Sequence, residues 1–403
     1  MFVLETRKDA LLKPLQAAVG VVERKHTLPI LANVLIEPVD DRTALVATDL
    51  ELEITTWTSQ ATVAETALTV SARKLLDICR ALPDGEVIKL ELDGEQLKLR
   101  AGKSRFSLQT LPARDFPRMQ LARAGATFHA MSQARTENTQ FSLQNPTWSD
   151  SSRIWPTEGE AIRLSLPQRR LRHLLARVQY AMAVQDIRYY LNGLLISLQG
   201  DRLVVAATDG HRLALDATTL PDTHEQGVDV ILPRKTVQEL IKLLDESETP
   251  VDVQLSRSQV MIAQSGFELR SKVVDGKFPD YQRVIPSGYE KSFVIERERL
   301  NQALARTAIL TNEKYRGVRL ALTHGSLRLS CNNNEQEEAQ EELEVDYQKD
   351  PLDISFNVQY LQDVLNNLDS ETVQCSFGDA SSSMLITVPG EEHFRYVVMP
   401  MRI

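Results

Sequence analysis

Hydrophobic and polar positions follow the same succession of patterns three times along the chain. Each copy opens with a short strand pattern that runs into a helix-like segment, at 2–22, 162–184 and 293–312. An extended apolar block follows in each copy, at 28–36, 190–196 and 315–321. A succession of element types that recurs within one chain indicates repeated structural units. We therefore expect three copies of one fold.

The second half of each copy reads as a helix followed by a hairpin. The second helices are predicted to begin near Ser71, Pro233 and Asn357, where apolar residues start to recur at helical spacing. Beyond these helices every second residue is apolar, which is the pattern of a strand. Asp93-Gly94 between two such stretches is a strong hairpin signal. The copies close on Phe116-Pro117, Phe278-Pro279 and Met399-Pro400. The pattern predicts an α+β fold with two helices packed on antiparallel sheets in each of three repeated domains.

The spacing of the copies predicts the domain boundaries. We expect domains at 1–120, 159–286 and 287–403, with an insertion at 121–158 after the first. This connection is much longer than the one between the second and third copies, and it is rich in Ser, Thr, Gln, Asn and Ala. We interpret it as a surface loop or linker. The alternative is a loop that docks a partner through Trp148 and Trp155.

Composition narrows the class of protein. The chain has 403 residues, of which 42% are hydrophobic and 25% charged, as expected for a soluble globular protein of two or three domains. No apolar run approaches the roughly 18 residues that span a bilayer, so we expect a cytoplasmic protein without membrane contact. The three cysteines are widely separated, which favours reduced thiols over disulfides.

Charge is distributed unevenly over the predicted elements. The net charge of −9 argues, as an average, against a nucleic-acid partner. The segment between Pro167 and Gln185, however, contains no acidic residue and four arginines, Arg169, Arg170, Arg172 and Arg177. One basic helix is usually a solvated face, but several in register would give a basic helical side and an acidic sheet side. The basic side could follow a phosphate backbone without reading bases.

The most enzyme-like cluster is Asp209-Gly210-His211-Arg212, because a carboxylate beside a histidine can move protons. No serine or cysteine nucleophile motif accompanies it, and Asp-Gly is also a common turn, which is the interpretation we favour. Ala101-Gly-Lys-Ser104 resembles the end of a phosphate loop, but Leu97 stands where that motif needs glycine. The histidines lack metal-ligand spacing. We expect no catalytic residue, cofactor or metal.

Four segments together resemble the bacterial sliding clamp family, the β subunits of DNA polymerase III. They are Arg-Tyr-Tyr-Leu-Asn-Gly at 188–193, Thr-Asp-Gly-His-Arg-Leu at 208–213, Phe-Pro-Asp-Tyr at 278–281 and Tyr-Val-Val-Met-Pro-Met-Arg at 396–402. The resemblance covers nearly the whole chain apart from the insertion. It implies a non-enzymatic processivity factor, in which two chains join head to tail in a ring. Helices line the hole around duplex DNA, which is held without regard to sequence.

The resemblance also implies partners and three sets of site residues. The partners are the replicative DNA polymerase, the clamp loader and other proteins with a clamp-binding motif. The DNA-facing residues are Arg24, Lys25, Arg73, Gln185, Tyr189, Tyr190 and Lys235. A peptide cleft between the second and third domains is formed by Arg188, Leu191, Thr208, Gly210, His211, Arg212, Leu213, Pro279, Arg283, Val284, Asn357, Tyr360, Ser381, Ser383, Val397, Met399, Pro400, Met401 and Arg402. The homodimer interface contains Lys74, Lys103, Arg105, Phe106, Leu108, Ile309, Leu310, Glu335, Glu337, Glu338 and Glu341.

Two other hypotheses fit parts of the sequence. One is an enzyme that uses Asp209 and His211. The other is a monomeric three-domain scaffold that binds peptides but not DNA. Substitution of His211 separates the first from a clamp, and the mass of the particle in solution separates the second.

Overall fold

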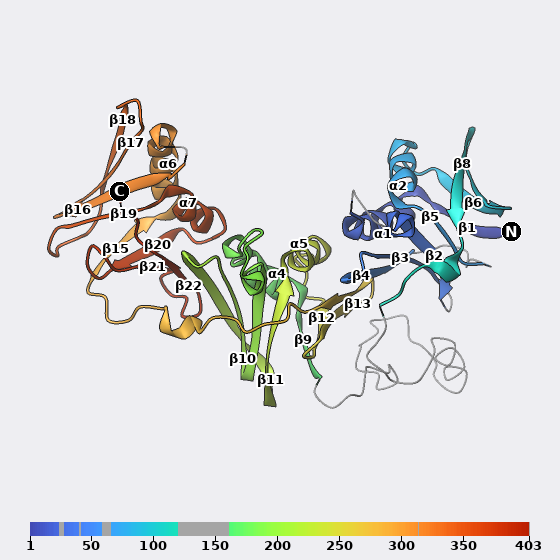
Figure 1. The fold of residues 1–403 in the computed structure, drawn as a ribbon, viewed down its shortest axis with the longest axis horizontal. Helices are drawn as coiled ribbons and strands as arrows, with labels where there is room; N and C mark the ends of the chain where they lie inside the picture. The colour runs from blue at the N-terminus through green and yellow to red at the C-terminus, as the bar shows by residue number, and fades with distance from the viewer. Residues whose placement is uncertain (24–27, 40–41, 59–65, 120–160, 313, 403) are drawn as a thin grey trace. The chain divides into compact units, whose positions relative to one another are not determined.

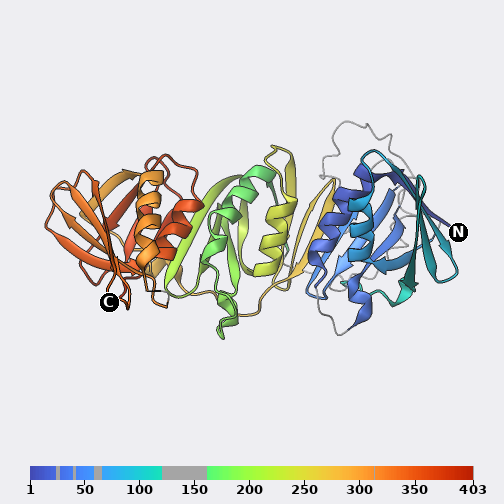
Figure 2. The same ribbon diagram turned by 90° about the horizontal axis from the view of Figure 1, so that it is seen from above.

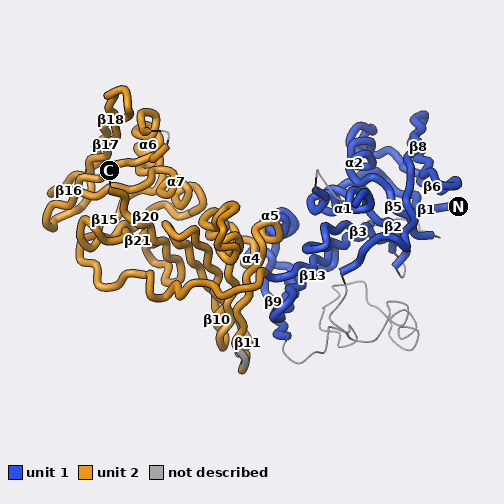
Figure 3. Tube along the Cα trace, viewed as in Figure 1, with its two compact units in different colours: residues 1–169, 238–273 blue, residues 170–237, 274–403 orange. Residues whose placement is uncertain are grey.

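The computed structural model describes residues 1–403 except 24–27, 40–41, 59–65, 120–160, 313 and 403. The predicted insertion at 121–158 lies outside the described residues. The chain divides into two compact units (Figure 3). Unit 1 contains residues 1–169 and 238–273, and unit 2 contains residues 170–237 and 274–403.

Unit 1 is built on one twelve-stranded sheet with the order β1-β6-β7-β8-β5-β2-β3-β4-β14-β13-β12-β9. Its strands are β1 (Phe2–Arg7), β2 (Asn33–Val39), β3 (Arg42–Thr48), β4 (Leu52–Trp57), β5 (Leu68–Ser71), β6 (Val87–Asp93), β7 (Gln96–Ala101), β8 (Ser104–Leu111), β9 (Ile162–Pro167), β12 (Pro250–Leu255), β13 (Gln259–Gln264) and β14 (Phe267–Lys272). Helices α1 (Lys8–Val21) and α2 (Ala72–Ala81) lie side by side against it (Figures 1 and 2). They bury their apolar faces, including Leu11 and Leu15 on α1 and Leu75 on α2.

Unit 2 contains a six-stranded sheet, β10-β11-β22-β21-β20-β15, and a four-stranded sheet, β18-β17-β16-β19. The strands are β10 (Gly193–Thr208), β11 (Arg212–Pro233), β15 (Lys291–Glu296), β16 (Gly317–Thr323), β17 (Ser326–Asn332), β18 (Glu338–Glu344), β19 (Leu352–Asn357), β20 (Thr372–Phe377), β21 (Met384–Thr387) and β22 (Arg395–Val398). Helices α6 (Arg297–Thr307) and α7 (Val358–Asn366) pack together, and Asn301 donates a hydrogen bond to Asn366 between them. Helices α4 (Gln168–Ala176) and α5 (Arg234–Leu243) each have residues in both units.

The threefold repeat and the α+β class are confirmed. Each copy begins with a strand and a helix, and the predicted second helices begin at Ala72, Arg234 and Val358. The predicted hairpin at Asp93-Gly94 joins β6 to β7. The segment at 162–184 contains the expected strand and helix, but α4 ends at Ala176 and a 3-10 turn, η3 (Gln179–Ala181), follows, so Arg177 lies beyond the helix.

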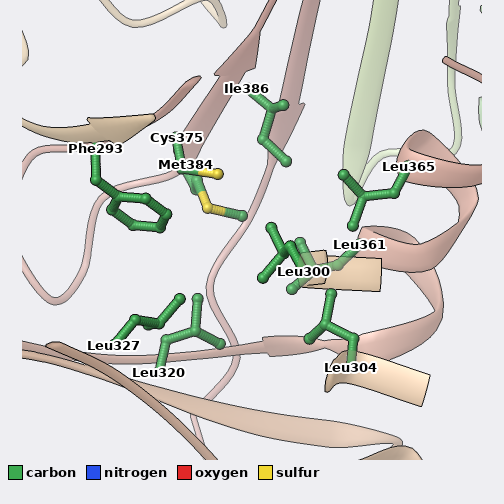
Figure 4. Close-up of a pocket in the computed structure, with 10 residues that line it drawn as sticks. All are labelled: Phe293, Leu300, Leu304, Leu320, Leu327, Leu361, Leu365, Cys375, Met384 and Ile386. Atoms are coloured by element: carbon green, nitrogen blue, oxygen red, sulfur yellow. The ribbon is translucent and has the colours of Figure 1, made fainter. Parts of the chain in front are cut away.

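The core of the third copy lies between α6, α7 and the two sheets of unit 2 (Figure 4). A cavity of about 10 Å³ remains in it, and its lining consists only of hydrocarbon side chains and the sulfur atoms of Cys375 and Met384. A space of this size holds at most one water molecule, and the lining offers no strong hydrogen-bond partner, so we expect it to be dry. Burial raises the pKa of the Cys375 thiol to about 12, which suits the predicted reduced state.

Candidate functional site

The sequence Thr208-Asp209-Gly210-His211 forms a tight turn between β10 and β11. The Thr208 hydroxyl donates to the Arg212 carbonyl at 2.6 Å and accepts from the Gly210 amide at 3.1 Å. The Asp209 carboxylate accepts hydrogen bonds from the amides of His211 and Arg212. Gly210 has a φ of +90°, a conformation that favours glycine. The interpretation of this cluster as a turn is confirmed, and its carboxylate serves the backbone.

The first copy contains the same turn. Leu50 takes the place of Gly210 with a φ of +80°. The Thr48 hydroxyl again donates to the carbonyl two residues beyond that position, that of Leu52, at 3.0 Å. The Asp49 carboxylate again accepts from two following amides, those of Glu51 and Leu52. The third copy keeps the left-handed residue, Gln336, at a φ of +66°. Each turn leads directly into a strand, β4, β11 or β18.

In the second copy, the strand after the turn is β11, and it pairs with β22, the last strand of the chain. We call this junction the seam: residues Arg212–Leu215 of β11 pair antiparallel with Arg395–Val398 of β22. Leu213 lies opposite Val397, and both belong to a buried apolar cluster that includes Phe278. Beyond the seam, the Met399 amide donates to the His211 carbonyl at 2.9 Å. The seam therefore brings together cleft residues predicted from distant parts of the sequence.

All the predicted peptide-cleft residues lie in unit 2, at three levels of burial. Leu191, Leu213 and Val397 are buried. The half-buried residues are Thr208, Gly210, Arg212, Asn357, Tyr360, Ser383, Pro400 and Met401. The exposed residues are Arg188, His211, Pro279, Arg283, Val284, Ser381, Met399 and Arg402. Among these, Val284 and Met399 are exposed apolar side chains close in sequence to buried members of the cluster.

Several of these polar side chains already have partners within the chain. Arg188 bonds to Asp186 through its backbone amide and guanidinium, which lowers the pKa of Asp186 to about 2. Asn357 caps α7 by accepting from the Gln359 amide at 2.9 Å. The Ser381 hydroxyl and amide donate to Asp379, whose pKa is lowered to about 2 by the hydroxyls of Ser382 and Ser381.

Arg212 is the most engaged of the predicted cleft residues, and its side chain is only 9% exposed. Its guanidinium donates to Asp209 at 3.0 Å, to Asp363 at 2.5 Å and to the Tyr180 carbonyl at 2.6 Å. It also lies 4.3 Å from the ring centroid of Tyr360. Burial alone would lower the pKa of Arg212, but Tyr396 and the neighbouring carboxylates outweigh burial and raise it. Arg212 thus carries a permanent charge beneath the surface.

The predicted basic helical side is smaller than the sequence implies. Lys8 is buried and donates to the Leu82 carbonyl and to Asp84. Arg177 is also buried and pairs with Glu391 at 2.7 Å. Arg170 donates to the Ala217 carbonyl, and Arg169 pairs with Glu248. Formal charge along a helix overestimates the charge offered to a ligand wherever the side chain turns inward.

The predicted DNA-facing residues are spread over both units. Arg24 and Lys25 lie outside the described residues. Arg73 on α2 is exposed and donates to the Val22 carbonyl at 2.8 Å. Gln185, with a φ of +55°, and Tyr189 are exposed, and Tyr190 contacts Tyr189 edge to face. Lys235 is half-buried in the first turn of α5.

Five of the eleven predicted interface residues lie on two strands whose edges are open. β18 is the outer strand of the four-stranded sheet, and Glu338 and Glu341 belong to it. β5 reaches only Thr110 and Leu111 of β8. The rest of β8 has one strand neighbour among the described residues, β7, and it carries Arg105, Phe106 and Leu108.

The remaining six interface residues lie outside these two strands. Lys74 is exposed on α2, and Lys103 is exposed in the turn before β8. Ile309 and Leu310 form the 3-10 turn η6 (Ala308–Leu310), where Ile309 is 77% exposed. Glu335 and Glu337 are exposed ahead of β18. Within the chain, Glu341 pairs with Arg306 on α6, and these hydrogen bonds lower the Glu341 pKa.

Sequence reasoning did not identify Asp216, Asp363, Glu391 and Phe394, which hold the buried guanidinium groups. One signal was present. Asp216 interrupts the apolar strand pattern Leu213-Ala-Leu-Asp-Ala217, and an acid in a buried strand needs a cationic partner. The partner itself, 39 residues earlier at Arg177, is not visible from spacing.

Among the described residues, no helix is both long enough and apolar enough to cross a membrane. In the same part of the chain, no three His, Cys, Asp or Glu side chains gather in a group that could bind a metal.

Comparisons with known proteins agree along the whole chain. Models of the N-terminal, central and C-terminal domains of the DNA polymerase III beta subunit match residues 2–120, 165–280 and 282–402. The beta sliding clamp of Pseudomonas putida is 42% identical over 398 residues, which are 98% of this chain and 99% of that protein. The clamp of Escherichia coli is 40% identical over 397 residues, 98% of each chain.

A solved structure leads to the same family. A sliding clamp from Pseudomonas aeruginosa, crystallised bound to griselimycin, is 40% identical with a TM-score of 0.86, and the match covers all of both chains. The threefold repeat, the family models and these full-length relatives therefore assign the chain to the beta sliding clamps, the β subunits of DNA polymerase III.

Proposed function

We propose that two copies of this chain join head to tail in a ring around duplex DNA and act as a non-enzymatic processivity factor. The ring would tether the replicative DNA polymerase, and it would be opened and closed by a clamp loader. One observation carries the proposal. In each of the first two copies, the strand after the repeated turn pairs with the last strand of the next copy, as β4 with β14 and β11 with β22.

The third copy continues this series but lacks a following copy. Its turn leads into β18, whose outer edge is open, and the last strand of the first copy, β8, also has an open edge. An interface between two different edges is heterologous and closes into a ring when its rotation permits. If the third copy pairs in the same way as the first two, β18 of one chain would pair antiparallel with β8 of another. Lys103 and Arg105 would then face Glu338 and Glu341.

The mass of the particle tests this assembly. Sedimentation at micromolar concentration is expected to give two chains of 45.4 kDa each, and electron microscopy is expected to show a central opening. A monomer at these concentrations would favour the scaffold hypothesis. A dimer without an opening would refute enclosure of DNA.

DNA would be held by its phosphates and by intervening water, because sliding requires many nearly equivalent registers. Arg73, Gln185, Tyr189, Tyr190 and Lys235 are the described candidates. Retention on circular DNA that is lost when the circle is cut would distinguish enclosure from ordinary binding. Equal retention on linear and circular DNA would contradict the proposal.

Partner proteins would dock a short peptide on the surface above the seam. Exposed Met399 and Val284 offer apolar contact there, and the flexible thioether of methionine can adapt to different partners. Griselimycin, the ligand of the Pseudomonas aeruginosa relative, is the available probe. We expect it to bind this chain and to compete with the polymerase. The substitution His211→Ala should weaken binding while the dimer persists, whereas loss of an intrinsic turnover would favour the enzyme hypothesis.

A further inference from the structure

The seam is short, and at each of its ends lies an arginine whose side chain is at least nine-tenths enclosed. Four residue pairs form it, from Arg212 opposite Val398 to Leu215 opposite Arg395. Arg212 itself occupies the first end. At the other end, the next residue of β11 is Asp216 and the residue before β22 is Phe394, and both contact Arg177.

Arg177 links the second and third copies. It follows α4 in the second copy, and it is 4% exposed. Its Nη1 atom lies 3.3 Å from Asp216 Oδ2 in the same copy and 2.7 Å from Glu391 Oε2 in the third. Its guanidinium carbon lies 4.5 Å from the ring centroid of Phe394, which is a cation–π distance. One side chain therefore contacts β11 and the segment that leads into β22, at the end of their pairing.

Arg212 makes the corresponding link at the opposite end. Within the second copy it donates to Asp209 and to the Tyr180 carbonyl. Across to the third copy it donates to Asp363 and faces the Tyr360 ring. The Tyr360 carbonyl also accepts a hydrogen bond from Tyr396 of β22 at 2.8 Å. Both arginines thus draw their partners from two copies of the fold.

This arrangement resists sliding or opening of the seam. A buried guanidinium is tolerated only while its charge is paired, and removing a partner leaves an uncompensated charge. A shift of β22 along β11 would carry Glu391 and Phe394 away from Arg177 while Asp216 stayed. The paired state is therefore the favoured one, and it fixes where the backbone of β22 lies.

We propose that Arg177 is a positioning residue for partner binding: together with Arg212, it brackets the seam and so fixes the surface that carries Leu213, Val397 and Met399. The inference rests on the proposed peptide-docking function. Arg177 itself is none of the predicted cleft residues, so its effect on binding is indirect. The same geometry gives Arg212, a predicted cleft residue, an additional role beneath the cleft.

Other charged groups face this end of the seam. His173 on α4 lies 3.0 Å from Arg177 through Nε2, and Asp369, after α7, lies 3.9 Å from His173 Nδ1. Arg170 on α4 also acts electrostatically on Asp216. Burial, followed by the charges of Arg177 and Arg170, lowers the pKa of His173. The histidine therefore adds no competing cation near neutral pH.

The test measures griselimycin affinity and local hydrogen exchange in full-length variants. Glu391→Ala removes the half-exposed partner of Arg177 with little risk to folding, and Arg177→Met removes the charge while keeping much of the side-chain length. Glu392→Ala, at the exposed neighbouring glutamate, is the matched control. Arg177→Lys tests rescue, because it restores a charge without the planar guanidinium.

We expect Glu391→Ala to weaken griselimycin binding roughly threefold to tenfold, a size typical of residues that act through neighbours. Arg177→Met should weaken it further, and Arg177→Lys should recover part of the loss. The amides of 395–398 should exchange faster in both weakened variants. Glu392→Ala should keep wild-type affinity and exchange, and the mass of the dimer should be the same in every variant.

Wild-type affinity and exchange in Glu391→Ala would overturn the inference even if Arg177→Met failed to fold. Failure of the wild-type chain to bind griselimycin would refute the proposed docking function, and the inference with it. Faster exchange throughout unit 2 would identify a general structural role and would also contradict positioning.

Discussion

At the scale of single residues, the main feature is where positive charge is buried. Lys8, Arg177 and Arg212 are each enclosed, and each has a carboxylate partner, in Asp84, Glu391 and Asp363 respectively. Such pairs contribute little net stability compared with apolar residues of the same shape. They do make the native arrangement specific, because few other arrangements satisfy them.

Arg177→Met is expected to lower the free energy of unfolding by about 3–5 kcal/mol, because it strands the buried Asp216 carboxylate. Adding Asp216→Asn should recover part of this loss, since the amide carries no charge. Urea denaturation of the single and double variants measures the effect. If the double variant lost as much unfolding free energy as Arg177→Met alone, or more, the prediction of a stranded carboxylate would be contradicted.

The contacts of Arg177 and Asp216 also predict how folding stability depends on pH. Burial raises the pKa of Asp216 above its usual value, although Arg177 opposes the shift. The folded state therefore binds this proton more tightly than the unfolded state, and the contribution of Asp216 to stability falls as pH rises through its titration. In Arg177→Met the pKa should rise further. The stability gap to wild type, measured by thermal unfolding, should narrow from neutral toward acidic pH.

At the scale of elements, the repeated turn is the most regular feature. Two of its versions place a threonine hydroxyl and an aspartate carboxylate on the same backbone groups. They differ at the left-handed position, which is Leu50 in one copy and Gly210 in the other. For a residue with a Cβ atom this conformation costs about 1–2 kcal/mol.

The two turns permit a reciprocal experiment. Leu50→Gly is expected to stabilise the chain by up to about 1 kcal/mol, because relief of strain exceeds the entropic cost of glycine. Gly210→Ala is expected to destabilise it by about 1–2 kcal/mol and to disturb Arg188, whose guanidinium lies 3.0 Å from the added Cβ position. Calorimetry gives the sign of the stability change in each variant. A change of the same sign in both variants would contradict this explanation.

Much of the element pattern could be predicted from the sequence, and the reason is local. Helix starts at Ala72 and Val358 follow from apolar periodicity, and Asp93-Gly94 encodes its own turn. The inward direction of Lys8 and Arg177 could not be predicted, because charge along a sequence carries no information on burial. The link from Arg177 to Glu391 spans 214 residues, and only the fold brings them together.

At the scale of the whole molecule, the open edges of β8 and β18 are the two edges that we propose to join one copy to the next. The charges on the two edges differ in sign, with Lys103 and Arg105 on or beside β8 and glutamates on β18. Apolar Phe106, Leu108 and Ile309 would supply most of the affinity, and the charges would select which edges meet.

Reversing the charges Lys103→Glu and Arg105→Glu together is therefore expected to shift the dimer toward monomer, more strongly at low salt. Glu338→Lys and Glu341→Lys, added on the other edge, should restore association. Sedimentation equilibrium at several salt concentrations checks both steps. No recovery in the combined variant would contradict the proposed pairing of β8 with β18.

Contact with DNA is predicted to depend on few charges, because several helix cations are already paired within the chain. Lys235→Glu should shorten retention on circular DNA, most visibly at low salt, while griselimycin affinity stays the same. Arg328→Glu, on β17, is the control, because the proposed DNA-facing set does not include it. Equal retention by the two variants would exclude Lys235 from the DNA-facing surface.

The glutamates of β18 have a further consequence for a chain that has lost its partner. An exposed strand edge is a template on which other chains can aggregate, and a dissociated copy would expose two of them. Glu338, Glu341, Glu342 and Glu344 place like charges along one of these edges, so two copies of β18 repel each other. Replacing these glutamates by neutral residues would remove that protection and favour insoluble fibrous material from free chains.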